Sequence, residues 1–250
     1  MKLLNWSCTR SLMLASLTLA VLTGTATIVQ AADEKKNQEP PVIDPGSWRT
    51  PPSDAIVLFD GSSLDKWKGQ DGNDAPWKIV DGNAMEVAAG KGGVTTKDEF
   101  GSFQLHIEWA TPSEVKGEGQ GRGNSGVYLH GRYEVQVLDS YENKTYPDGQ
   151  AGALYSIAPP LVNASRPPGR WQSYDIIFNA PADKDDGSQS PATVTVLHNG
   201  VLIQNHVAVN RATTASPLKG LPKTGPIFLQ DHGNPVRYRN IWLRPLNHSH

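Results

Sequence analysis

The chain has 250 residues, of which 38% are hydrophobic and 19% are charged, so disorder throughout its length is excluded. The formal net charge of −2 gives no sign of the basic face that nucleic-acid binding requires. The 24 glycines and 19 prolines divide the sequence into short segments, which favours strands and turns over long helices.

The first 31 residues have the pattern of a secretory signal peptide. Lys2 and Arg10 provide a positive start, residues 11–22 form an apolar run, and Val29-Gln30-Ala31 fits the small-residue cleavage rule. This run is shorter than the roughly 20 apolar residues that span a bilayer, and no later stretch approaches that length. We therefore expect cleavage after Ala31 and an exported protein, periplasmic or secreted, with no membrane span.

The only cysteine, Cys8, lies within this predicted signal. The exported part would then contain no thiol, which excludes a disulfide partner, a cysteine-ligated metal and a thiol nucleophile. Residues 32–53 are polar and rich in proline, and we interpret them as a disordered linker.

Short runs with a period of two begin after this linker. They are residues 55–59, 77–87, 103–110, 125–130, 133–139, 173–180, 192–209, 226–232 and 238–246. Most are rich in Val, Ile, Tyr, Phe and Trp, and clusters of Gly, Pro, Asn and Asp separate them. This pattern predicts an all-β protein with one domain over residues 54–246, an antiparallel β-sandwich or jelly roll, followed by a frayed tail at 247–250.

Two of the connections have the chemistry of tight hairpins. Asp81-Gly82-Asn83 and Asn199-Gly200 each lie between apolar runs, and glycine and asparagine tolerate a positive φ. We expect a β-hairpin at each position.

Three of the runs carry carboxylates, amides and imidazoles on the face opposite their apolar residues. These polar residues are Gln104, His106 and Glu108 in the first run, Glu134 and Gln136 in the second, and Gln230 and His232 in the third. Antiparallel sheets commonly have one solvated face, so a plain structural explanation exists. If that face is curved, as in jelly rolls, we expect these residues to converge in one cleft.

Several longer motifs resemble the 3-keto-disaccharide hydrolase domain family. In order they are VLFDGSSLDKWKG, GRGNSGVYLHGRYEVQVLDS, GALYSIAPP, PPGRWQSYDIIF, HNGVLIQN and LQDHGNPVRYRNIWLRPL, and they cover roughly residues 54–246. The resemblance implies a jelly roll like that of concanavalin A. It also implies cleavage of glycosides that are already oxidised to a ketone at sugar carbon 3. Trp171-Gln172 departs from the Trp-Asn pair expected of the family, which puts the substrate detail in doubt more than the fold.

Such a reaction needs a base for the proton on carbon 2, a group that holds the enolate oxygen and an acid for the departing alcohol. The catalytic candidates are Glu134, His232 and Glu108. The candidates for substrate binding are Gln136, Gln230, Asn124, Arg239 and Asp139. Asp139 ends its strand, where a turn-capping carboxylate is equally expected, and His232 is followed by a turn that it could cap.

Two other interpretations stay open. A non-catalytic, lectin-like carbohydrate-binding module would have the same fold, and an adhesion domain tethered by the proline-rich arm is a weaker alternative. A binding module would more often display aromatic platforms, for which only Trp67 and Trp77 are available. Oxygen and imidazole donors could also hold a divalent metal ion.

Overall fold

The computed structural model describes residues 39–47 and 50–246. The predicted signal peptide at 1–31, residues 32–38 of the predicted linker, and the tail at 247–250 lie outside the described residues. Within the described part, no helix is long and apolar enough to cross a membrane.

Thirteen strands and two short 3₁₀ helices make up the regular structure of the described residues. They are β1 (Ile56–Phe59), β2 (Trp67–Gly69), β3 (Lys78–Val80), β4 (Ala84–Glu86), β5 (Val94–Thr96), β6 (Phe103–Ala110), η1 (Gly119–Gly121), β7 (Ser125–Leu129), β8 (Tyr133–Val137), η2 (Pro147–Gly149), β9 (Gln172–Asn179), β10 (Ala192–His198), β11 (Val201–Val209), β12 (Phe228–Leu229) and β13 (Arg237–Pro245).

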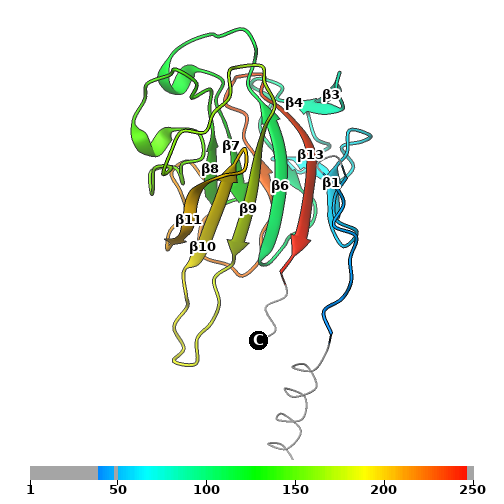
Figure 1. The fold of residues 1–250 in the computed structure, drawn as a ribbon, viewed down its shortest axis with the longest axis vertical. Coiled ribbons are helices and arrows are strands. Elements are labelled where there is room, and N and C mark those ends of the chain that lie inside the picture. The colour runs from blue at the N-terminus through cyan, green and yellow to red at the C-terminus, as the bar shows by residue number, and fades with distance from the viewer. Residues whose placement is uncertain (1–38, 48–49, 247–250) are drawn as a thin grey trace, which may run out of the picture. The chain divides into compact units, whose positions relative to one another are not determined.

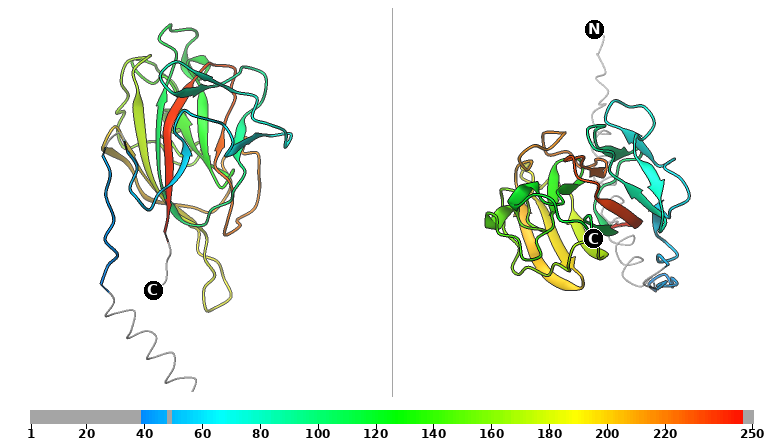
Figure 2. Two further views of the ribbon diagram at one scale, coloured as in Figure 1. Left: turned by 90° about the vertical axis from the view of Figure 1, so that its right-hand side faces the viewer. Right: turned by 90° about the horizontal axis from the view of Figure 1, so that it is seen from above.

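The strands form two antiparallel sheets. The larger sheet has eight strands in the order β11-β10-β9-β6-β13-β4-β3, with β1 also paired to β13. The smaller sheet has five strands in the order β2-β5-β12-β7-β8. Figure 1 looks onto the larger sheet, with β7 and β8 behind it, and Figure 2 gives two further views of the sandwich. The predicted all-β sandwich is confirmed.

Alternating side chains fill the space between the sheets. In β6, Phe103, Leu105, Ile107 and Trp109 are fully buried, while the residues between them are partly exposed. Tyr174 of β9 packs against Trp109 and donates a hydrogen bond to the Gln136 carbonyl of the opposite sheet at 2.7 Å. The core therefore lies where the period of two predicts it.

The two predicted hairpin turns are present. Gly82 and Asn83 both have a positive φ between β3 and β4, and Asn199 and Gly200 do so between β10 and β11. A pair of positive φ values matches the right-handed twist of the flanking strands. The turn residues thus fix two hairpins of the larger sheet.

Strand β13 contains a bulge that re-aims a polar side chain. Arg239 pairs with Glu108 and Trp242 pairs with His106, so two residues of β13 face one residue of β6. One of the two, Asn240, has a φ of 46°, a conformation that asparagine tolerates better than most residues. The bulge turns the Asn240 side chain toward Glu108, to which it donates a hydrogen bond.

The compact unit around the sandwich begins at Asp44, ten residues before the predicted domain start. The amide of Ser53 donates to the Asp44 carbonyl at 2.9 Å, and Asp44 in turn donates to the Ser53 hydroxyl. The final residues of the predicted linker are thus hydrogen-bonded to one another within this unit.

Candidate active site

The outer face of the smaller sheet carries the residues best suited to proton transfer. Strands β7 and β8 pair so that Gly126 lies opposite Gln136 and Tyr128 lies opposite Glu134. Their alternate residues, such as Val127 and Val135, belong to the buried core. Glu134, Gln136 and Tyr128 therefore point away from the larger sheet.

The carboxyl group of Glu134 is enclosed without a cationic partner. The residue is only 3% exposed, and none of the ion pairs in the described part of the chain involves it. Burial raises its pKa to about 8, while a hydrogen bond from the Tyr128 hydroxyl acts in the opposite direction. Both protonation states are accessible near neutral pH, as a general acid or base requires.

A glycine beneath Glu134 makes room for the carboxyl group. A Cβ added at Gly126 would lie 2.4 Å from Oε1 of Glu134 and 2.9 Å from Cε2 of Tyr128. These separations are shorter than van der Waals contact, so any larger residue would displace the carboxylate.

Amide side chains surround the same carboxyl group. The Gln136 amide lies 3.0 Å from Glu134 Oε1 and 3.0 Å from Gln120 Oε1. Gln230 donates to the Tyr128 hydroxyl at 3.1 Å, and its own Oε1 is buried without a partner in the described residues. Asn124 donates to the Gln120 carbonyl at 2.7 Å. Three predicted binding residues, Gln136, Gln230 and Asn124, are therefore gathered at this face.

Sequence reasoning missed the tyrosines and Gln120. Tyr155 donates its backbone amide to the Glu134 carbonyl, and its hydroxyl is hydrogen-bonded to that of Tyr146. Burial raises the pKa of both Tyr128 and Tyr146; the nearby Glu134 charge adds to the effect at Tyr128, and the hydrogen bond with Tyr155 adds to it at Tyr146. Alternation along residues 125–129 could have identified Tyr128, because it shares a face with Gly126 and not with the core residues. Gln120 lies in the three-residue helix η1 and Tyr146 directly precedes η2, and both segments are too short for a periodic pattern to point to them.

His232 and Asp139 lie at the edges of this region. His232 is exposed in the turn after β12, two residues beyond Gln230, and no side-chain partner is found for it in the described residues. Asp139 is buried and accepts from Arg122 Nε at 2.6 Å and from the Tyr141 amide at 3.3 Å. These contacts fit the turn-capping interpretation of Asp139, whose carboxylate is already occupied by protein donors.

The expectation that all the polar residues converge in one cleft is wrong. Glu108 and Arg239 lie on the outer face of the larger sheet, because their neighbours Ile107, Trp109 and Tyr238 face the core. The whole sandwich therefore separates them from Glu134. A period of two shows which side of a strand is polar but not which of the two sheets the strand joins.

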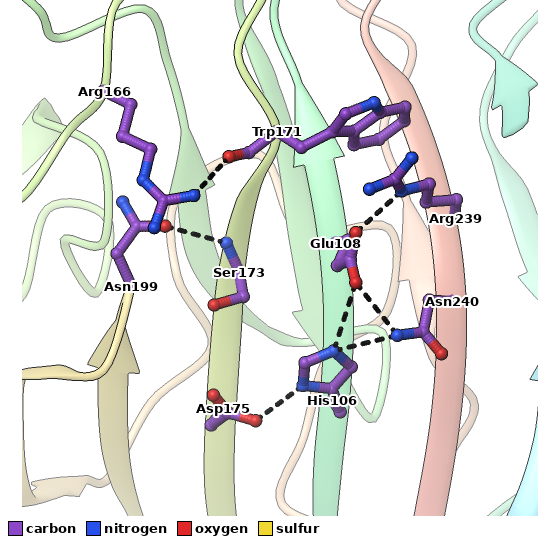
Figure 3. A network of polar contacts seen from close by, with 9 residues as sticks. All are labelled: His106, Glu108, Arg166, Trp171, Ser173, Asp175, Asn199, Arg239 and Asn240. Carbon is purple, nitrogen blue, oxygen red and sulfur yellow. Dashed lines mark hydrogen bonds and ion pairs between the residues drawn. The ribbon is translucent and has the colours of Figure 1, made fainter. Parts of the chain in front are cut away.

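A dense network holds Glu108 in place, as Figure 3 shows. Its Oε2 accepts from Arg239 Nε at 2.7 Å, and its Oε1 accepts from Asn240 at 2.9 Å. Burial favours the neutral acid, but hydrogen bonds from His106, Asn240 and Arg239 outweigh it and lower the pKa of Glu108 to about 2. A carboxylate with this pKa cannot exchange protons efficiently near neutral pH, which argues against Glu108 as the predicted acid or base.

His106 completes the network. Its Nδ1 lies 2.6 Å from Asp175 Oδ1, and its ring stacks on Trp242 with centroids 5.2 Å apart. Burial opposes its positive charge, but the hydrogen bonds to Asp175 and Glu108 prevail and raise its pKa to about 9. His106 is therefore a fixed cation at neutral pH.

The sequence allowed a divalent metal ion, but few strong metal ligands lie close to Glu134. Within residues 39–47 and 50–246, no group of three or more His, Cys, Asp and Glu side chains is arranged to hold a metal. Glu134 and the amide oxygens of Gln136 and Gln230 are the oxygen donors of the face. A metal there would have to be completed by ligands from outside the described residues, such as substrate oxygens.

Three comparisons place the chain among known proteins. Residues 54–244 match the 3-keto-alpha-glucoside-1,2-lyase-like domain. A 3-keto-disaccharide hydrolase of Bacteroides thetaiotaomicron is 26% identical over 238 residues, which cover 77% of this chain and 78% of that protein.

Solved structures agree with this assignment. A candidate glycosyl hydrolase from Parabacteroides distasonis ATCC 8503 is 48% identical, with a TM-score of 0.77 over 84% of this chain and 93% of that one. A second structure from the same organism is 21% identical and has a TM-score of 0.56 over 77% of this chain and 94% of that one, which shows a shared fold. The family match, the Bacteroides protein and the 48% identical structure support a glycoside hydrolase-like function. The chain belongs to the family of 3-keto-alpha-glucoside-1,2-lyase-like domains.

Proposed function

We propose that this protein cleaves the glycosidic bond of 3-keto-glycosides, including 3-keto-disaccharides, at the outer face of the smaller sheet. The observation that carries the proposal is the buried Glu134 carboxyl group, which has a pKa of about 8 and no cationic partner among residues 39–47 and 50–246. The family match and the name of the Bacteroides relative support the choice of substrate.

The ketone determines the chemistry. It acidifies the proton on carbon 2, so a base can take that proton and leave an enediolate. The electron pair then forms the bond between carbons 1 and 2 while the oxygen substituent on carbon 1 departs with a proton. Water adds to carbon 1 and a proton returns to carbon 2, so the net result is hydrolysis.

Each step has a residue suited to it. Ionised Glu134 takes the proton from carbon 2 and can return one in the hydration step. The enolate oxygen accepts hydrogen bonds from the amides of Gln136 and Gln230, which replace the predicted Arg239 because Arg239 lies on the other sheet. His232 follows Gln230 by two residues, and we retain it as the proposed acid for the departing alcohol.

The direct test is product analysis with a p-nitrophenyl 3-keto-glucoside and its unoxidised parent, with and without a chelator, in heavy water. We expect nitrophenol only from the keto substrate, with deuterium at carbon 2 of the sugar product. Release from both substrates, or release without deuterium, contradicts the elimination mechanism. Retention of sugar without release supports the lectin-like binding module instead.

A matched pair of variants locates the reaction on one face. Glu134→Gln should lower turnover by roughly 10²- to 10⁴-fold, the usual contribution of a general acid or base. Glu108→Gln makes the same chemical change on the opposite face and should retain most of the activity. The reverse result would move the reaction to the larger sheet.

We also propose that the protein acts outside the cytoplasm, as its N-terminal sequence indicates. N-terminal sequencing of the protein from fractionated cells should give Ala32 as the first residue. An intact Met1 in the cytoplasmic fraction contradicts export.

A further inference from the structure

A cleft lies on the larger sheet, on the opposite side of the sandwich from Glu134. It has a volume of about 610 Å³ and lies over β1, β13 and β6, with the β3–β4 turn along its rim. Its lining residues are Pro51, Val57, Phe59, Asp60, Gly82, Asn83, Glu108, Arg239, Asn240, Ile241 and Trp242. This volume is within the range of small-molecule sites, and the reaction proposed above uses none of these residues.

Several hydrogen-bonding groups of this cleft have no protein partner in the described part of the chain. Arg239 uses only Nε, toward Glu108, so the N–H groups of both terminal nitrogens are available. Asn240 uses only its nitrogen, and Figure 3 shows its oxygen pointing away from Glu108. The exposed side chain of Asn83 makes no hydrogen bond. The cleft thus offers both donors and acceptors, which is what a sugar hydroxyl group requires.

The charge of the cleft favours a neutral ligand. Glu108 compensates Arg239, and Asp175 compensates the protonated His106 just outside the lining. The remaining charged group of the lining is Asp60. Its carboxylate accepts hydrogen bonds from Ser62 and forms no ion pair in the described residues. An acidic ligand would be repelled by Asp60, whereas hydroxyl groups can donate to it.

The polar groups are held in fixed positions before any ligand binds. The Arg239 guanidinium stacks over Trp171 with its Cζ 4.0 Å from the ring centroid, while Glu108 fixes its Nε. The bulge fixes Asn240, and Trp242 stacks on His106 at the cleft wall. Such preorganisation lowers the entropic cost of binding, and the apolar walls of Trp242 and Val57 can contact sugar C–H groups.

We propose that this cleft is a second saccharide-binding site, which takes a neutral oligosaccharide segment without cleaving it. It would hold one part of a glycan on the larger sheet while the smaller sheet faces solvent on the other side. The site needs no 3-keto group, so it stands whether or not the proposed reaction is correct.

The test uses unoxidised maltotetraose and cellotetraose, with tetragalacturonate as an acidic comparison, titrated into the purified protein. We expect binding of at least one neutral tetrasaccharide by calorimetry and no comparable binding of the acidic one. In NMR spectra, the indole N–H signals of Trp171 and Trp242 should shift. Those of Trp67 and Trp77 should not, because both are buried and bonded to backbone carbonyls.

Glycine variants remove the ligand contacts while keeping the backbone. Asn83 and Asn240 both have a positive φ, so Asn83→Gly and Asn240→Gly avoid strain. The double variant should bind at least about tenfold more weakly. His206→Gly is the matched control, because His206 is exposed with a positive φ and lies in β11, outside the lining.

Three outcomes overturn the proposal. They are no binding of either neutral tetrasaccharide, equal or tighter binding of tetragalacturonate, and binding that the double asparagine variant leaves unchanged. Binding that Glu134→Gln abolishes and the double variant spares would also overturn it, since that sugar occupies the other face. Loss of catalysis in Glu134→Gln with normal tetrasaccharide binding separates this proposal from the proposed reaction.

Discussion

The two outer faces of the sandwich shift the pKa of a glutamate in opposite directions. On the smaller sheet, Glu134 has tyrosine and amide neighbours, and burial raises its pKa to about 8. On the larger sheet, burial acts on Glu108 in the same direction, but Arg239, Asn240 and His106 lower its pKa to about 2. Both residues belong to strands with the same alternating pattern. The partners beside the carboxyl group, from the same strand and from neighbouring strands, therefore decide whether it exchanges protons or binds a cation.

The largest effect that would sharpen this comparison comes from crowding the Glu134 carboxyl group. Gly126→Ala places a methyl group 2.4 Å from Oε1 and must move the carboxylate. Because a displacement of about 1 Å can cost about 100-fold in rate, we expect a loss of that size in turnover of the 3-keto substrate. Gly121→Ala is the control, since nothing lies within 4 Å of its added Cβ. Equal rates for the two variants would place the reacting group elsewhere.

The next effect concerns stability. Glu108→Gln removes the charge that compensates Arg239, and we expect the free energy of unfolding at pH 7 to fall by about 2 kcal/mol. Glu134→Gln replaces a carboxyl group that is mostly protonated at this pH, so it should change stability by less than about 1 kcal/mol. Urea unfolding measures both. A larger loss for Glu134→Gln would show that its carboxylate has an ionic partner in solution.

The two glutamates should also give opposite dependences of stability on pH. The raised pKa of Glu134 means that the folded state binds more protons above pH 4.5, so stability falls as the pH rises toward 8. The depressed pKa of Glu108 means that the unfolded state binds more protons between about pH 2 and 4.5, so stability is lost on acidification. Each effect has an upper bound of about 1.4 kcal/mol for every unit by which the pKa is shifted.

The variants Glu134→Gln and Glu108→Gln show which glutamate causes each dependence of stability on pH. Burial lowers the pKa of His198 and His130, so both histidines also make stability depend on pH between pH 5 and 6, but they do so in wild type and in the variants alike. The difference in unfolding free energy between wild type and Glu134→Gln isolates Glu134 and should fall as the pH rises from 5 to 6, whereas the difference between wild type and Glu108→Gln should change only below pH 4.5. A difference between wild type and Glu134→Gln that stays constant from pH 5 to 6 contradicts the raised pKa.

The smallest effect tests the bulge that shapes the larger face. Alanine at position 240 must adopt the φ of 46°, so Asn240→Ala should be about 1 kcal/mol less stable than Asn240→Gly. Both variants lose the hydrogen bond to Glu108, and the difference between their thermal unfolding curves isolates the backbone strain. Identical curves would mean that the bulge relaxes without the asparagine.

Much of the fold could be predicted because local patterns determine it. Alternation from Phe103 to Trp109 identified the core face of β6, and Gly82-Asn83 identified a hairpin. The pairing of strands could not be predicted, because β13 meets β6 although Arg239 and Glu108 are 131 residues apart in the sequence, and no local signal records that contact.

Because strand pairing could not be predicted, the sequence could not show that the candidate residues belong to two different sheets. Glu134, Gln136, Gln230 and Asn124 lie on one face, because β7, β8 and the segment after β12 are neighbours in one sheet. Glu108 and Arg239 satisfied the same sequence rule but belong to the other sheet. The pKa of a carboxyl group depends on its partners in space, so alternation alone could not distinguish the two faces.

The bulge at Asn240 has a consequence for how this protein can evolve. If β13 kept every residue but ran as a regular strand, each side chain after Asn240 would point to the opposite side of the sheet, exposing Ile241 and Leu243 and driving Trp242 and Arg244 into the core. A one-codon deletion of Asn240 would instead keep Ile241 facing the core, because the pairs that flank the bulge stay in register. The strand therefore tolerates loss of the bulge residue itself, whereas an insertion or deletion elsewhere in β13 would turn the side chains beyond it to the wrong face.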